Sequence, residues 1–161
     1  MLSIEPLTDP SDVEACAAMM AASDPWRTLG RGREACARAL GDRTRERWIA
    51  RDAAGIAGFL ILNMRGAFVG YIQTVFAAER ARGTGVGSEL LAFAEERIFR
   101  ESPNAFLCVS SFNEGAKRLY ERSGYEVVGV LRDYLVRGYD EILMRKTIGP
   151  IDEFRSSPSA P

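Results

Sequence analysis

The stretch "RARGTGVGSELL", residues 80–91, places three glycines at alternate positions behind an arginine and directly before an apolar helical pattern. Glycine costs roughly 1 kcal/mol relative to alanine inside a helix, so Gly83, Gly85 and Gly87 are expected where a side chain would obstruct another group. A helix N-terminus presents unpaired N–H groups and the positive end of the helix dipole. The stretch therefore predicts an anion-binding loop at the start of a helix. A tight turn without a ligand is the alternative.

The length of 161 residues is that of about one domain. We expect a single domain over residues 1–148 and a Pro- and Ser-rich tail over 149–161, partly disordered. The formal net charge of −1 argues against a general nucleic-acid or membrane-surface binder. No apolar run approaches the ~18 residues of a membrane span, so neither nucleic acid nor membrane is an expected partner.

The cysteines and the N-terminus predict a cytoplasmic, reduced protein. Cys16, Cys36 and Cys108 are odd in number, and "MLSIEPLTDP" has neither a basic nor an apolar targeting segment. The chain contains no histidine, which excludes a His-dependent triad, and its scattered cysteines argue against a metal site.

Hydrophobic periodicity predicts alternating strands and helices in the order βααβββαβαββ. Three apolar runs, residues 45–52, 55–64 and 67–77, are joined by connections so short that they must form an antiparallel meander. A helix over 84–100 then crosses over to a further strand. The remaining expected strands are 2–7, 105–111, 125–136 and 140–148, and the remaining helices are 9–23, 33–40 and 113–124. The fold class is α/β (α+β), with a mixed, mostly antiparallel sheet of about seven strands and helices on both faces.

Three kinds of nucleotide-binding loop can be compared with the glycine stretch. A Walker loop needs Lys-Ser/Thr after its last glycine, whereas Ser88-Glu89 follows here, which excludes it. A Rossmann loop needs G-x-G-x-x-G in a parallel unit, and the spacing here is G-x-G-x-G after an antiparallel meander. A pyrophosphate cradle of the pattern R-x-x-G-x-G fits Arg82, Gly85 and Gly87.

Two segments together resemble a known family. "VFAAERARGTGVGSELL" (75–91) is similar to the acetyl-coenzyme A motif of the GNAT superfamily of N-acetyltransferases. "NEGAKRLYERSGYEVVG" (113–129) is similar to the second motif of that superfamily, N-x-x-A-x-x-L-Y-x-x-x-G-[FY], in the same order and spacing. The resemblance runs from the first strand to about Lys146 and is greatest to ribosomal-protein alanine N-acetyltransferases. It implies the GNAT fold, in which the fourth and fifth strands splay apart.

The resemblance also implies how acetyl-coenzyme A (acetyl-CoA) would be held. Strand residues Val75, Phe76 and Ala77 would pair with the pantetheine arm through the backbone groups of Val75 and Ala77. Asn113 would contact the pantetheine or only cap its helix. The pyrophosphate would lie on Arg82, Gly83, Thr84, Gly85, Val86, Gly87 and Ser88.

Tyr120 is implied as the catalytic residue near the thioester sulfur, with core packing as the alternative. Its phenol, of unperturbed pKa ~10, can protonate a departing thiolate. The base is open. Relatives carry a glutamate on the strand before the second motif, and Cys108 stands there in this chain. Other groups that could relay the proton through water are Tyr71, Glu79, Ser110 and Asp133, and Gln73 could orient that water.

The acceptor pocket is expected to use Trp26, Tyr71, Gln73, Asp133 and Tyr134. Trp26 could offer a flat surface, beside an Asp24 that could attract an ammonium, or it could cover the core instead.

We therefore expect a metal-free acyltransferase that moves acetyl from acetyl-CoA to a peptide α-amine or a small-molecule amine by direct attack in a ternary complex. A catalytically silent acyl-CoA-binding or sensing module is the alternative. The acyl-chain preference and a homodimer remain open.

Overall fold

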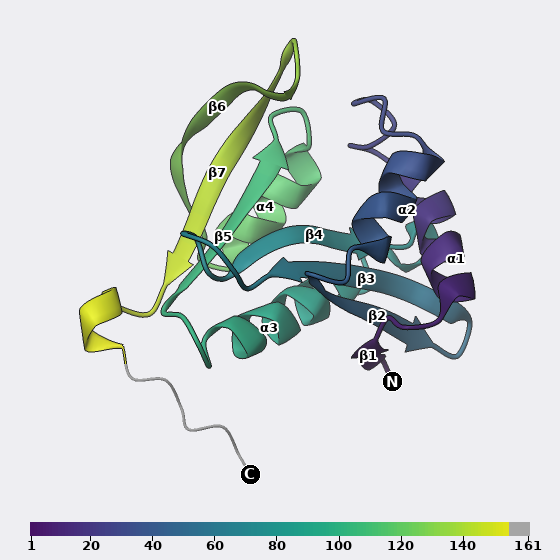
Figure 1. Ribbon diagram of the computed structural model, residues 1–161, viewed down its shortest axis with the longest axis horizontal. Coiled ribbons are helices and arrows are strands. Elements are labelled where there is room, and N and C mark those ends of the chain that lie inside the picture. Colours follow the sequence, from purple (N-terminus) through teal and green to yellow (C-terminus); the bar gives the residue numbers. More distant parts are fainter. Residues whose placement is uncertain (155–161) are drawn as a thin grey trace.

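The computed structural model describes residues 1–154 and has a seven-stranded mixed sheet with helices on both faces, which confirms the predicted fold class (Figure 1). The elements are β1 (Ser3–Pro6), α1 (Pro10–Ala21), α2 (Arg33–Gly41), β2 (Glu46–Asp52), β3 (Gly55–Asn63), β4 (Tyr71–Ala77), α3 (Val86–Ile98), β5 (Asn104–Ser110), α4 (Glu114–Arg122), β6 (Glu126–Val136) and β7 (Tyr139–Thr147). Two 3₁₀ turns lie at Glu79–Ala81 and Ile151–Glu153.

The strands follow one another across the sheet in the order β1-β2-β3-β4-β5-β7-β6. The neighbours β2, β3 and β4 are antiparallel, as the short connections between them require. Among the strands of residues 1–154, only β4 and β5 pair in parallel, and the crossover through α3 joins them. The predicted meander and crossover are both confirmed.

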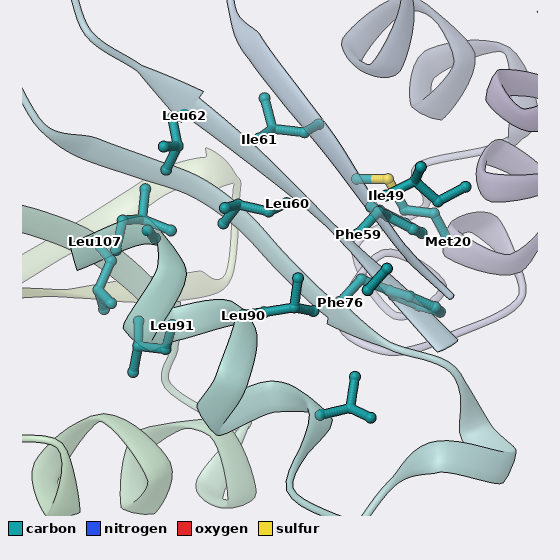
Figure 2. Packing of buried hydrophobic residues seen from close by; sticks show 14 of the residues in the cluster. Met20, Ile49, Phe59, Leu60, Ile61, Leu62, Phe76, Leu90, Leu91 and Leu107 are labelled. Carbon is teal, nitrogen blue, oxygen red and sulfur yellow. The ribbon is translucent and has the colours of Figure 1, made fainter. Parts of the chain in front are cut away.

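The core lies on both faces of the central strands. Leu90 and Leu91 of α3 approach the sheet from one face, and Met20 of α1 lies on the other (Figure 2). Phe59 of β3 and Phe76 of β4 stack at a ring-centroid distance of 4.5 Å. The two layers of apolar side chains fix β3 and β4 between the helices.

The parallel pair β4–β5 is held together only at its beginning. Its register consists of Tyr71 opposite Phe106 and Ile72 opposite Leu107, after which the two strands diverge (Figure 1). At that point β4 also carries a bulge, because Ile61 and Leu62 of β3 face Thr74 and Ile72, which leaves Gln73 as an extra residue. The divergence is the splay that the resemblance implied.

Several element boundaries differ from those expected. The strand predicted from residue 67 begins at Tyr71, because Gly66 and Gly70 adopt positive φ angles of 88° and 91° and turn the chain. The 3₁₀ turn at Ile151–Glu153 was not expected in the tail. The disorder expected for the last residues concerns 155–161, which lie outside the described residues. Among the helices of residues 1–154, none has the length and apolarity to cross a membrane.

We predict that Gly58→Ala destabilises the protein by about 1–3 kcal/mol, because overpacking a closed core forces its neighbours to shift. A Cβ at Gly58 would clash with the carbonyl oxygen of Phe76 and lie 2.9 Å from Leu90 Cδ1. Gly129→Ala on β6 is the matched control, since its Cβ would meet nothing within 4 Å. Urea denaturation measures both, and equal midpoints for the two variants would contradict the close approach of α3 to β3.

Candidate active site

A cavity of about 930 Å³ opens where β4 and β5 separate. Its wall combines the loop between α1 and α2, the diverging strands, the glycine loop before α3, helix α4 and the β6–β7 pair. Its size is at the upper end of the range for small-molecule and cofactor sites. The split in the sheet lets one cavity reach the groups on both faces.

The glycine loop owes its composition to two different constraints. Gly83 and Gly85 have φ angles of +76° and +98°, a region that side chains rarely enter, while the space around both is open. Gly87 is inside α3, and a Cβ there would lie 3.3 Å from Leu119 Cδ2 of α4. The structure adds a reason for glycine at Gly83 and Gly85 that the sequence did not show, their positive φ angles, and the expected need for room beside an anion stays a prediction. Two of the glycines have backbone angles that favour glycine, and at the third a larger residue would press on Leu119 of α4.

The first turn of α3 points its donors at the cavity end formed by the glycine loop. Val86, Gly87 and Ser88 begin the helix, so their N–H groups have no intrahelical acceptor. Within residues 1–154, no side chain caps this helix. Unpaired donors and the positive helix end make this an anion-binding surface, which fits the pyrophosphate of a coenzyme A.

The free edge of β4 faces the same cavity. Ala78 donates its N–H to Ala57 of β3, so the alternate residues Ala77 and Val75 present theirs to the opposite edge. The register of β5 with β4 ends at Ile72, before these residues. An extended ligand can therefore add to β4 as a strand would, which agrees with the predicted roles of Val75 and Ala77.

Exposed arginines line the cavity, and one of them, Arg82, belongs to the glycine loop. Arg82 lines it, and its Nε lies 3.5 Å from the carbonyl oxygen of Ala77. Arg122, in the last turn of α4, also lines the cavity and was not expected. The sequence did not indicate Arg122, because it is far from the glycine loop along the chain. Only the packing of α4 beside α3 brings Arg122 and the loop to the same cavity.

Tyr120 of α4 lines the cavity and is 8% exposed. Burial alone raises the pKa of its phenol to about 12, with no hydrogen bond contributing among the described residues. Its ring meets that of Tyr125 edge-on at a centroid distance of 6.0 Å. The Tyr120 phenol therefore keeps its proton at neutral pH, in a position that is largely shielded from water.

Asn113 caps α4, since its Oδ1 accepts the N–H of Ala116 at 3.3 Å. It also lines the cavity. The cap fixes its carbonyl oxygen toward the helix and leaves the amide NH₂ as the group that a ligand could meet.

Aromatic residues predicted for the acceptor also line the cavity. Trp26 lies against Phe76 at a centroid distance of 5.9 Å and lines the cavity, so it contacts the core and the cavity together. Tyr134 lines it from β6 and is 56% exposed. Asp24 also lines it, but its carboxylate accepts from Thr28 Oγ1 at 2.7 Å and from Arg27 at 3.0 Å.

Tyr71 and Gln73 line the cavity from β4. Burial, followed by the neighbouring Cys108, raises the pKa of the Tyr71 phenol. Burial likewise raises the pKa of the Cys108 thiol, so at neutral pH the thiol keeps its proton. Gln73, at the bulge, accepts from Arg45 Nε at 3.2 Å.

Sequence reasoning missed Glu141 of β7, which lines the cavity and is 3% exposed. Its Oε1 accepts the hydroxyl of Ser110, the opposite residue on β5, at 2.6 Å. Burial raises the pKa of this carboxyl, and the bond from Ser110 opposes the rise. The sequence held a signal, because Glu141 alternates in phase with Tyr139 and Leu143.

Four of the site residues predicted from the sequence lie outside the cavity lining. Thr84 Oγ1 donates to the carbonyl of Ala81 at 2.7 Å, and the Val86 side chain is buried in the core. Asp133 instead holds the β6–β7 hairpin, accepting the N–H of Gly138 at 2.6 Å. Glu79 is exposed in the 3₁₀ turn after β4. Among residues 1–154, no three His, Cys, Asp or Glu side chains gather as metal ligands would.

The sequence profile of the acetyltransferase (GNAT) family matches residues 13–125, more than two thirds of the chain. The chain belongs to this family. The match includes both motifs and the loop that carries Trp26. Membership supports an acyltransferase that uses acetyl-CoA.

Individual relatives agree with this assignment. Acetyltransferase Atu2258 of Agrobacterium fabrum (strain C58 / ATCC 33970) is 32% identical over 83 residues, which are 52% of this chain and 59% of that protein. The crystal structure of Arabidopsis thaliana NAA60 with a bisubstrate analogue has a TM-score of 0.73 at 19% identity, covering 91% of this chain and 98% of that one. An aminoglycoside 6'-N-acetyltransferase complexed with coenzyme A has a TM-score of 0.74 at 16% identity, covering 92% and 98%. At these identities the two structures show a shared fold.

We predict that Tyr120 contributes stability that disappears in alkali. Its pKa rises from an ordinary value of ~10 to about 12 on folding, so the contribution is complete below pH 10 and is lost as pH rises to 12. The slope is at most about 1.4 kcal/mol per pH unit. Urea denaturation at pH 9 and pH 11 checks it. The loss should be smaller in Tyr120→Phe, and an equal loss in both proteins would contradict the burial of the phenol.

Proposed function

We propose that the protein is an N-acetyltransferase that transfers acetyl from acetyl-CoA to a primary amine, either a peptide α-amine or a small molecule, in a ternary complex. The observation that carries the proposal is one cavity that joins an anion-binding helix start, a free strand edge and a buried tyrosine. The resemblance of the motifs to ribosomal-protein alanine N-acetyltransferases supports the peptide α-amine and stays a prediction.

The residues present fit coenzyme A. The first turn of α3 would hold the pyrophosphate with Arg82, and the edge of β4 at Val75 and Ala77 would pair with the pantetheine. The open space around Gly83 and Gly85 leaves room for phosphate oxygens. Acetyl-CoA supplies an activated acetyl group, whose C–S bond breaks as a C–N bond to the amine forms.

Tyr120 would hold a proton at its hydroxyl and give it to the departing thiolate. A phenol suits this task because its pKa lies at or above that of a thiol, so it stays protonated until the sulfur becomes negative. The burial of Tyr120 keeps bulk water from competing as the donor.

A catalytically silent acyl-CoA-binding or sensing module remains the second candidate. The observation that favours it is Cys108, which occupies the strand position where the resembling enzymes carry a glutamate and whose buried thiol stays protonated. Such a module would bind acetyl-CoA and acetylate no amine.

We predict that acetyl-CoA at ~100 times its dissociation constant raises the melting temperature by roughly 5–10 °C, since it adds ~2.7 kcal/mol and each kcal/mol is worth ~2–4 °C in a domain of this size. Gly85→Ala should reduce that rise, because a side chain at φ +98° distorts the cradle. Gly32→Ala, at an ordinary φ of −70° outside the cavity, should leave it unchanged. The absence of any rise in the unmodified protein would refute the proposal.

We predict that Tyr120→Phe lowers kcat about 100-fold with an accepted amine and keeps the thermal shift by acetyl-CoA, because the phenol acts on the proton and not on cofactor binding. Release of free thiol from acetyl-CoA measures turnover. Tyr125→Phe is the matched control, since it removes a buried tyrosine hydroxyl next to Tyr120 that lies outside the cavity lining. Equal losses in both variants would count against the assigned role.

A further inference from the structure

A buried carboxylate with no cationic partner among residues 1–154 lines the cavity. Glu141 is at the beginning of β7, and Ser110 gives it one neutral hydrogen bond. The titratable groups that face it, Cys108 of β5 and Tyr71 of β4, are neutral at pH 7, and Tyr134 of β6 lies beyond Tyr71. A buried carboxylate normally has a cationic partner, because desolvation of a lone charge is costly. Within residues 1–154 only Ser110 is bonded to it.

The position of Glu141 in the cavity relates it to the proposed acetyl transfer. Ser110 is the last residue of β5 and lies beyond the point where β5 diverges from β4. The Glu141 carboxylate, opposite Ser110 on β7, therefore lies on the β5 side of the split. Tyr71 lies close to Cys108 and Glu141, and Trp26 lines the same cavity against Phe76, farther along β4, whereas Tyr120 lines it from α4. A molecule lying against Glu141 is therefore on the other side of the split from the expected thioester.

We infer that Glu141 binds the ammonium group of the acceptor and takes its proton. This inference rests on the proposed function and deepens it. The carboxylate supplies the charge partner that the ammonium needs, and the ammonium neutralises a carboxylate that the fold leaves unpaired. Glu141 thereby does the work for which relatives use a glutamate at the position of Cys108, from the neighbouring strand and on the same face of the sheet.

The proton balance is simple. The ammonium loses one proton to the carboxylate, which leaves a neutral amine and a neutral carboxyl. The nitrogen loses a second proton as the amide forms, and this proton replaces, through water, the one that Tyr120 gives to the departing thiolate. The carboxyl later returns its proton to solvent, so one proton is released for each acetyl group transferred. Burial favours this exchange, because it raises the pKa of Glu141 toward that of the amine.

The lining also indicates the acceptor class. Among the described residues that line the cavity, the acidic ones are Asp24 and Glu141. The carboxylate of Asp24 already accepts hydrogen bonds from Thr28 and Arg27. One free carboxylate in a cavity that Trp26 and Tyr134 also line fits an amine with a single positive charge and an apolar or aromatic body. A polycation would leave its further charges opposite Arg31, which also lines the cavity.

Binding of an amine tests the role of Glu141 and does not require acetyl transfer to take place. With coenzyme A present, 2-phenylethylammonium should bind the unmodified protein at pH 7.5, measured by calorimetry. Neutral 2-phenylethanol and polycationic kanamycin should bind at least tenfold more weakly. Glu141→Gln, which keeps an oxygen for Ser110, should bind 2-phenylethylammonium at least tenfold more weakly. Glu126→Gln on exposed β6 is the matched control and should bind it normally.

Turnover and stability separate a catalytic from a structural role. Glu141→Gln should lower kcat/KM about 100-fold at pH 7.5 and recover as pH approaches 9–10, where solution supplies neutral amine. Its melting temperature at pH 7.5 should be no lower, since the ionised carboxylate carries a burial cost that the amide does not.

The outcomes are distinguishable. Amine binding that depends on Glu141 without thiol release would support the ammonium site and refute the acetyltransferase. Failure of the unmodified protein to bind 2-phenylethylammonium, or equal binding by Glu141→Gln, would overturn the assignment of Glu141. Thiol release that is unchanged in Glu141→Gln would uphold the acetyltransferase and overturn the role of Glu141.

Discussion

The divergence of β4 from β5 is the constraint on which the rest of the structure depends. Two residue pairs hold the strands together, Tyr71 with Phe106 and Ile72 with Leu107, and beyond them each strand follows its other neighbour. Such a split leaves backbone groups unpaired in the middle of a sheet, which is costly unless a ligand or water meets them. The packing of β4 against β3 and of β5 against β7 keeps the split open.

The split also divides the chemical tasks between the two faces of the sheet. One face carries the glycine loop, the start of α3 and Tyr120. The loop and the helix start suit an anion, and the Tyr120 phenol keeps its proton. On the other, Trp26, Tyr71 and Glu141 form an aromatic surface with a single buried charge. A flat, fully paired sheet would keep these groups apart, whereas the opening lets them face one cavity.

Burial links stability with chemistry at this site. Tyr120 has its pKa raised because its charged form would be poorly solvated, and the same cause acts on Glu141. The phenol is favoured by the fold in its neutral form, and the carboxylate is tolerated at a cost. Groups that a fold holds at a cost are typical of functional sites, where selection for activity outweighs selection for stability.

The sequence by itself determined the order of the elements, the meander, the crossover and the glycine loop, because these follow from local periodicity, short connections and glycine spacing. The two motifs also located Arg82 and Tyr120, which lie within or directly beside local signals. Only the tertiary structure decided that Gly87 serves helix packing, that Asp133 serves a hairpin and that Arg122 and Glu141 reach the cavity. The reason is physical. Glu141 meets Ser110 across 31 residues of chain. Neither strand alone shows that the sheet opens beside this pair, or that no cation among residues 1–154 is bonded to the carboxylate.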